Sequence, residues 1–324
     1  MKNASDFKWR FNLGNYTFKV LGYGDYDFSR YLRALMHLET PGLLNEQVTI
    51  HLIDTRTTGF SPPKEGLKWE KVNPYNGELL NFGEQKAVYN TGELSFTLVD
   101  YKQKEIYYWV SDFNRLPPNE TAAPLRSLFH HWFETTSMFL CHAGGLGLAG
   151  KGVLLTGKSG AGKSTSTLAC LESSLSYGGD DFILVDSENC RAYSLYGVAK
   201  LNTEQFSRFP HLKKHISNRE QLPHEKGHVY IDDIAKNKMI NNFRIEALLL
   251  PTITGKTHTF IQECSKADAV MALVPSSVWI LRSSVSTAEK MKVFISKVPT
   301  YRLMAGTELR QIPEVLIHKL NHDN

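Results

Sequence analysis

One nine-residue stretch, GKSGAGKST at 157–165, constrains the fold of this chain more than any other feature. It matches the pattern G-x-x-x-x-G-K-[ST], follows the apolar run VLLT and precedes residues that suit a helix. A strand, a glycine-rich loop and a helix in this order bring backbone N–H groups close to the oxygens of a bound phosphate. The motif therefore predicts an α/β nucleotide-binding domain.

The residue types within this loop suit phosphate binding. Glycines at 157, 160 and 162 permit positive φ angles. The loop lysine supplies positive charge to the β- and γ-phosphates, and the hydroxyl of the next serine can coordinate Mg²⁺. We therefore expect all nine residues to contact ATP. They are Gly157, Lys158, Ser159, Gly160, Ala161, Gly162, Lys163, Ser164 and Thr165.

The composition is that of an ordinary globular protein, with 324 residues, 42% hydrophobic and 22% charged, and a formal net charge of +4. This length predicts about two domains. Basic residues are scattered, and the loose run HLKKHISNREQLPHEK at 211–226 is typical of a solvated face. We therefore expect no nucleic-acid partner.

The four cysteines, at 141, 170, 190 and 264, are too far apart in sequence for a metal-binding or redox pair, so we expect free thiols in a reducing compartment. The first residues, MKNASDFKWRFN, lack the apolar segment of a signal peptide. The least charged stretch, 135–150, is interrupted by glycines and a histidine and is a poor membrane span. These features predict a cytoplasmic protein with no membrane partner.

The composition changes near residue 120. Short runs rich in aromatic and β-branched residues predict strands over 16–24 and 47–54 and a hairpin over 94–112, so we expect a β-rich α+β domain over 1–120. Apolar residues at helical spacing predict a helix over 122–140. Strands then alternate with helices, and we assign 121–324 to an α/β domain that contains the phosphate loop.

A phosphate loop that performs chemistry needs carboxylates to hold a metal and to handle the nucleophile. Three acidic sites compete for this role. Asp186 follows the apolar run FILV, and this pattern alone favours it. Asp232 and Asp233 end the similar run HVYIDD. Asp180 and Asp181 instead follow a glycine pair, seventeen and eighteen residues beyond the loop lysine.

A histidine strengthens the case for the adjacent pair. Repulsion between two neighbouring carboxylates is best offset by a cation or a histidine. His142 lies fifteen residues before Gly157, where the hairpin that leads into the loop strand is expected to begin. His142, Asp180 and Asp181 therefore form a candidate triad that could bind Mg²⁺ and deprotonate a hydroxyl. Asp186 stays open as the acid of a nucleotide-dependent switch.

The stretch CHAGGLGLAGKGVLLTGKSGAGKST, followed by YGGDDFILV, resembles the catalytic domain of the bacterial HPr kinase/phosphorylase, whose fold is similar to phosphoenolpyruvate carboxykinase. The resemblance covers about 140–187 and rests on three features in register: the histidine, the loop and the acidic pair. It implies an HPr-kinase-like α/β P-loop kinase domain, preceded here by the β-rich domain.

The resemblance also implies roles for these residues. Asp180 would be the general base toward a serine hydroxyl, with His142 and Asp181 in support. Ser164 would hold Mg²⁺ together with Asp180 or Asp181, and Lys163 would act on the phosphates. The glycine-rich signature that HPr kinases carry after the acidic pair is absent. The chain is therefore more similar to the HPr-kinase-related group, which includes kinases that tailor lasso peptides.

Two further lysines, Lys200 in SLYGVAKL and Lys256 in RIEALLLPTITGKTHT, lie in segments that resemble this group. Each of these two lysines is either a contact for the phosphate or the acceptor or, more simply, an exposed surface lysine. The favoured function is an ATP- and Mg²⁺-dependent kinase for a serine hydroxyl of a small protein or a peptide, such as a precursor peptide, in a chain that could form a homo-oligomer. The alternatives are a small-molecule kinase and a regulatory ATPase without an acceptor.

Overall fold

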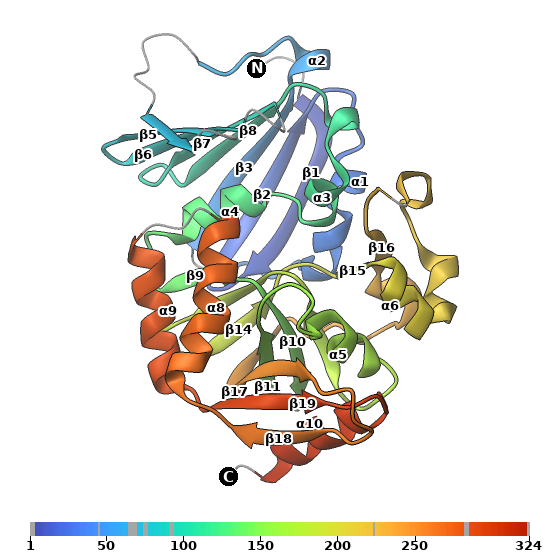
Figure 1. The fold of residues 1–324 in the computed structure, drawn as a ribbon. Coiled ribbons are helices and arrows are strands. Elements are labelled where there is room, and N and C mark those ends of the chain that lie inside the picture. Colours follow the sequence, from blue (N-terminus) through green and yellow to red (C-terminus); the bar gives the residue numbers. More distant parts are fainter. Residues whose placement is uncertain are drawn as a thin grey trace. The chain divides into compact units, whose positions relative to one another are not determined.

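The computed structural model describes residues 4–44, 46–63, 70–73, 77–90, 94–222, 224–281 and 285–322. The chain forms two compact units, Met1–Trp132 and Phe133–Asn324 (Figure 1). The sequence-based division into 1–120 and 121–324 stays a prediction about domains.

The first unit is built on one sheet. Its elements are β1 (Ala4–Leu13), β2 (Tyr16–Tyr23), α1 (Phe28–Tyr31), η1 (Arg33–Leu38), β3 (Glu46–Asp54), α2 (Thr55–Thr58), β4 (Glu70–Asn73), β5 (Gly77–Phe82), β6 (Gln85–Asn90), β7 (Ser95–Asp100), β8 (Glu105–Val110), η2 (Phe113–Arg115), α3 (Pro118–Ala122) and the start of α4 (Arg126–Phe133). The strand order is β1-β2-β3-β8-β7-β6-β5-β4, and β3 runs parallel to both of its neighbours. The expected strands over 16–24, 47–54 and 94–112 are confirmed as β2, β3 and the β7–β8 hairpin.

The single helix expected over 122–140 is wrong. The segment contains the end of α3, the separate helix α4 and the strand β9 (Met138–Cys141). Ala123 leaves the helical region because it precedes Pro124, and Leu125 has a φ of +60°. The apolar spacing is helical, but the chain turns at the proline before a second helix begins.

The second unit is a mixed α/β domain. Its elements after β9 are β10 (Ala143–Leu148), β11 (Lys151–Thr156), α5 (Lys163–Ala169), β12 (Ser176–Gly179), β13 (Ile183–Asp186), β14 (Arg191–Ser194), β15 (Val198–Leu201), α6 (Thr203–Arg208), η3 (Pro210–His215), η4 (Arg219–Gln221), β16 (Gly227–Tyr230), α7 (Ile231–Ile234), β17 (Asn242–Ile253), β18 (Phe260–Glu263), α8 (Lys266–Leu281), α9 (Val285–Lys297), β19 (Thr300–Ala305) and α10 (Gln311–His322). The main sheet has the order β12-β10-β11-β17-β14-β13-β9, and β19 joins β17 to β18. β17 runs parallel to both β11 and β19.

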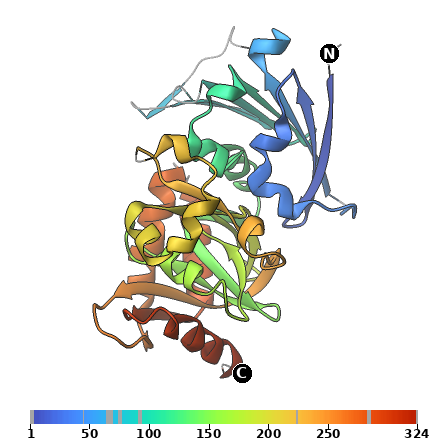
Figure 2. The same cartoon turned by 90° about the vertical axis from the view of Figure 1, so that its right-hand side faces the viewer.

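The strand that leads into the phosphate loop lies at the centre of this unit. Successive side chains of a strand point to opposite faces. Leu154 of β11 packs in a core with residues of α8 and α9, whereas Val153 and Leu155 pack in a second core with residues of α10. Figure 2 shows α10 at the base of the unit, beside the strands. Helices on both faces therefore hold β11 in place, which fixes the start of the loop.

Glycines in the neighbouring strands make room for one aromatic ring. A Cβ added at Gly152 would lie 2.3 Å from the ring of Phe243, and one added at Gly178 would lie 2.7 Å from it. Both distances are shorter than real contacts allow, so β11 and β12 can pack against Phe243 of β17 only because these two positions carry no side chain. This packing accounts for part of the glycine-rich sequence on either side of the phosphate loop.

All four cysteines are free, and Cys141 and Cys170 are buried. Among the helices that the structure describes, none combines the length and the apolar character needed to cross a membrane.

Candidate active site

The motif at 157–165 forms a loop between β11 and α5. Gly157, Gly160 and Gly162 have φ angles of +152°, +82° and +104°. Residues with a Cβ atom are strained at such positive φ angles, so these three positions require glycine for the loop to adopt its conformation. Gly162 is the residue that precedes the first helical residue, Lys163.

Lys163 lies against this loop. Its side chain is buried, and Nζ donates hydrogen bonds to the carbonyl oxygens of Gly157 at 2.7 Å and Lys158 at 3.3 Å. Burial lowers the pKa of Lys163, while the nearby carboxylates of Asp180 and Asp181 act to raise it. The ammonium group is therefore held within the loop, on the side that faces the acidic pair.

Strand pairing brings the acidic pair and the histidine together. β9 and β13 are antiparallel, with Cys141 opposite Ile183, so the residues just after β9 lie beside those just before β13. Nε2 of His142 lies 3.2 Å from Oδ1 of Asp181. Asp181 has a φ of +96°, a strained conformation for a residue with a side chain. Backbone strain of this kind clusters at functional sites.

Asp181 is held as a carboxylate. Its Oδ2 accepts a hydrogen bond from Nζ of Lys200 at 2.7 Å. Burial raises the pKa of Asp181, but the Lys200 ammonium and then His142 lower it more, so the pKa lies well below its usual range. Asp181 is therefore ionised throughout the neutral range and fixes the positions of both neighbours.

Asp180 lies in a different environment from its neighbour. Its side chain is 2% exposed, and Oδ1 has no hydrogen-bond partner among the residues that the structure describes. Burial raises the pKa of Asp180 to about 6, opposed by a hydrogen bond with the Ser164 side chain. The two adjacent aspartates thus have pKa values shifted in opposite directions, a pattern typical of sites that use one carboxyl group as a base.

His142 is fixed from its backbone side. Its N–H donates to Oγ of Ser277 at 3.0 Å, and its ring lies beside that of Phe182 at a centroid distance of 5.6 Å. Nδ1 is buried and has no partner among the described parts of the chain. With Nε2 directed at Asp181, the imidazole is positioned to orient that carboxylate.

The loop, the acidic pair and the histidine line one cavity of about 200 Å³. Three basic side chains that the motif does not include also line it: Lys200 on β15, Arg208 on α6 and Lys226 just before β16. Arg208 pairs with Glu204 at 2.6 Å. The cavity is therefore rich in positive charge around the acidic pair, which suits the phosphates of a nucleotide.

Sequence reasoning missed two of these cations. Lys226 is the last residue of the run at 211–226, which we interpreted as a solvated face, and it reaches the cavity because β16 follows it. Arg208 comes from α6, whose N-terminus is capped by Asn202 and Gln205. No sequence motif marks either residue. Lys226 reaches the cavity through the pairing of β16 with β15, and Arg208 through α6, which follows β15.

The alternative acids lie elsewhere. Asp186 ends β13, three residues beyond Ile183, which places it about 10 Å farther along the strand from the histidine. Both of its carboxylate oxygens accept hydrogen bonds from the turn that follows, including one from Asn189 Nδ2 at 2.7 Å. Asp232 and Asp233 are exposed at the start of α7 and do not line the cavity. Lys256 is exposed and also lies outside it.

The donor atoms near the loop fit a magnesium ion. Mg²⁺ binds oxygen ligands, commonly one or two carboxylates with substrate phosphates and water. Asp180 offers a buried carboxylate oxygen that has no described protein partner, and the Ser164 hydroxyl lies next to this carboxyl group. Asp181, which contacts His142 and Lys200, offers carboxylate oxygens of the same acidic pair, so Ser164 and one carboxylate of this pair could hold the ion.

Comparison with known proteins gives little beyond these observations. No protein-family model matches the chain, and no curated protein matches it. Among solved structures, the Hpr(Ser) kinase/phosphatase from Coxiella burnetii is similar, with 14% sequence identity over 57% of this chain and 99% of that chain. The TM-score of this match is 0.32, at which the likeness assigns neither fold nor activity.

Proposed function

We propose that this protein is a kinase that transfers the γ-phosphate of ATP to a hydroxyl group, in particular to a serine of a peptide or small protein. One observation supports this most directly: the phosphate loop and a buried carboxyl group with a raised pKa line the same cavity. A buried carboxyl group with a raised pKa beside the loop lysine is the kind of group that catalytic sites use as a base.

Each residue has a defined task in the proposed reaction. The loop N–H groups and Lys163 position the phosphates and stabilise their charge, which are the main contributions of a protein to phosphoryl transfer. Asp180, with a pKa of about 6, is largely ionised at pH 7.5 and can accept a proton. The acceptor oxygen forms a bond to the γ-phosphorus, the bond to the β–γ bridging oxygen breaks, and ADP leaves as the hydroxyl proton passes to Asp180.

The surrounding residues position this base. Asp181 stays ionised between Lys200 and His142, so its fixed negative charge helps to keep the pKa of Asp180 raised. Ser164 and a carboxylate oxygen of the acidic pair would hold Mg²⁺, which neutralises phosphate charge when bound. The proposed specificity for serine rests on the resemblance of the sequence to HPr-kinase-related proteins. Testing this specificity requires an acceptor that carries a serine.

The test is transfer of label from γ-labelled ATP in the presence of Mg²⁺. The acceptors are any peptide or small protein encoded beside this gene, an HPr protein of the same organism, and a reaction without acceptor. Label on a serine supports the proposal. ATP hydrolysis at equal rates with and without every acceptor would instead favour a regulatory ATPase.

A further inference from the structure

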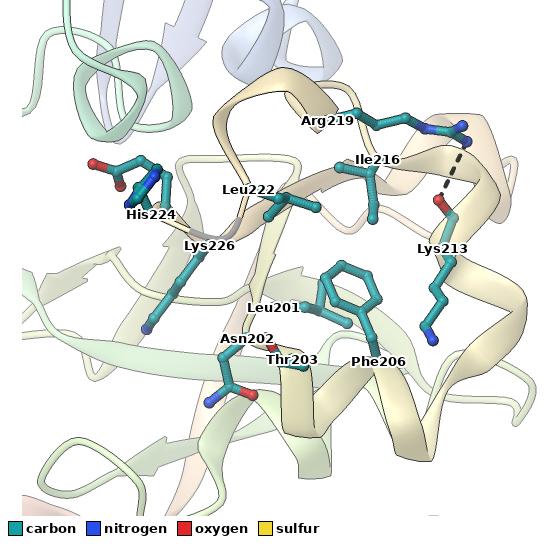
Figure 3. Close-up of a pocket in the computed structure, with 11 residues that line it drawn as sticks. Leu201, Asn202, Thr203, Phe206, Lys213, Ile216, Arg219, Leu222, His224 and Lys226 are labelled. Atoms are coloured by element: carbon teal, nitrogen blue, oxygen red, sulfur yellow. Dashed lines mark hydrogen bonds between the residues drawn. The ribbon is translucent and has the colours of Figure 1, made fainter.

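A second hollow, whose lining is drawn in Figure 3, shares Asn202 and Lys226 with the active-site cavity. It has a volume of about 490 Å³ and is formed by β15, α6, η3, η4 and the residues just before β16. We refer to it as the side groove. It is lined by Leu201, Asn202, Thr203, Phe206, Lys213, Ile216, Arg219, Leu222, His224, Glu225 and Lys226.

The floor of the side groove is apolar. Phe206, Ile216 and Leu222 point toward one another across it (Figure 3). Phe206 is almost fully buried and fixed by the core beneath, whereas Ile216 and Leu222 are partly exposed. A large apolar side chain placed between them would remove this surface from water, which is favourable.

The rim of the side groove is basic. Lys213, Arg219, His224 and Lys226 line it, against a single carboxylate, Glu225. The Arg219 guanidinium donates to the carbonyl oxygens of Lys213 and Lys214, at 3.3 and 2.6 Å, so it is held in place (Figure 3). Neither Lys213 nor Lys226 forms an ion pair with any residue in the described ranges. This charge is complementary to an anionic group.

The side groove adjoins the active-site cavity. Asn202 and Lys226 line both spaces, and none of the residues 157–165 lines the side groove. Asn202 follows Lys200 by two residues, and Lys200 holds Asp181. A molecule in the side groove therefore lies beside the active-site cavity, which must also hold the acceptor hydroxyl, without resting on the loop that holds the phosphates.

We infer that the side groove binds the segment of a peptide acceptor that flanks the phosphorylated serine, with a large apolar side chain on its floor and a carboxylate against its rim. This inference rests on the proposed kinase function. Recognition of an extended peptide commonly uses a pocket for one anchoring side chain, with charged groups around it for specificity.

The experiment is a positional-scanning library of synthetic peptides, each with one central serine, incubated with γ-labelled ATP, Mg²⁺ and the full-length protein. Wild-type protein is expected to favour leucine, isoleucine or phenylalanine at one position and aspartate or glutamate at a neighbouring position. Lys213→Glu should reduce the acidic preference by roughly fivefold or more, because attraction is replaced by repulsion. Leu222→Asp should remove the apolar preference.

The matched control is Lys214→Glu, which makes the same charge change on η3 at an exposed lysine that does not line the side groove. It should leave peptide selectivity unchanged. Labelled peptides without either preference, or equal effects of Lys213→Glu and Lys214→Glu, would overturn the inference while leaving the kinase function standing. A Leu222→Asp change that weakens ATP binding instead of peptide selection would assign the groove to the nucleotide. If no library pool takes label, the peptide-kinase function itself fails, and the inference with it.

Discussion

The substitution Asp180→Asn should make the protein more stable while it removes the proposed base. At pH 7.5 the Asp180 side chain is ionised in both the folded and the unfolded chain, but only the folded chain holds that charge away from water. Asparagine keeps the shape of the side chain and carries no charge at any pH. The substitution therefore relieves a cost that the folded protein otherwise bears.

The raised pKa gives the size of this effect. Burial raises the pKa of Asp180 from its ordinary value of 3.8 to about 6. A difference of one unit corresponds to about 1.4 kcal/mol, so the ionised carboxylate reduces the free energy of unfolding by about 3 kcal/mol. Because the folded pKa is the higher one, wild-type stability from this group is complete below pH 3.8 and is lost as the pH rises through about 6. The gain of the variant should thus reach about 3 kcal/mol at pH 7.5 and fade toward pH 4.

The assay is urea unfolding of both proteins between pH 4.5 and 8, in EDTA and without nucleotide, so that no metal or phosphate is bound at the site. Asp186→Asn is the matched control, a second buried aspartate with the opposite environment. Burial raises the pKa of Asp186, but hydrogen bonds from Asn189 and Glu188 outweigh it and lower the pKa overall. Asp186→Asn should therefore destabilise the protein at pH 7.5, less so as the pH falls. A gain for Asp180→Asn that is absent at pH 7.5, or that is the same at every pH, would refute the reasoning.

Three further predictions concern the same unit. Lys163→Met keeps the apolar stem of the side chain but removes the loop cation. Calorimetry should show ATP binding weakened by roughly tenfold or more, because hydrogen bonds to charged groups are worth about 1.5–3 kcal/mol. Unchanged affinity would exclude Lys163 from phosphate contact. Lys200→Met removes the cation that lowers the pKa of Asp181, so that pKa should rise and transfer should slow, because Asp181 loses one of its two fixed partners. An unchanged transfer rate would contradict this coupling. Gly152→Ala places a Cβ 2.3 Å from the Phe243 ring and 2.4 Å from the Leu146 carbonyl oxygen. The substitution should therefore lower the free energy of unfolding by about 1–3 kcal/mol or more. An unchanged melting temperature would contradict this packing.

The local parts of the site can be predicted from the sequence. The phosphate loop is encoded in nine consecutive residues, and the structure gives its glycines the positive φ angles that the motif implies. His142 and Asp181 meet because β9 and β13 are short antiparallel strands whose register places the end of β9 beside the start of β13. The apolar run before Asp186 favoured that residue over the acidic pair. The run predicts a strand, but it does not reveal that the start of this strand, and not its end, lies beside His142.

The remaining parts depend on long-range pairing, which a single sequence does not reveal. Lys226 and Lys200 line the same cavity because β15 and β16 pair, with Lys200 opposite His228. Burial and Lys200 lower the pKa of His228 to about 4, so this buried histidine is neutral and adds no charge. The error at 122–140 has a local cause, since helical spacing continues through a proline that interrupts the helix.

The most direct test of the account is a single-turnover measurement of γ-phosphate transfer to a serine acceptor, at saturating ATP and Mg²⁺, with Asp180→Asn and Asp186→Asn side by side. The acceptor is the best peptide from the positional library, and both variants are assayed at a temperature where each is folded. The account predicts that Asp180→Asn lowers the transfer rate by about 10²–10⁴-fold, the contribution of a general base, while Asp186→Asn stays near the wild-type rate. Full transfer by Asp180→Asn together with loss of transfer in Asp186→Asn would contradict it.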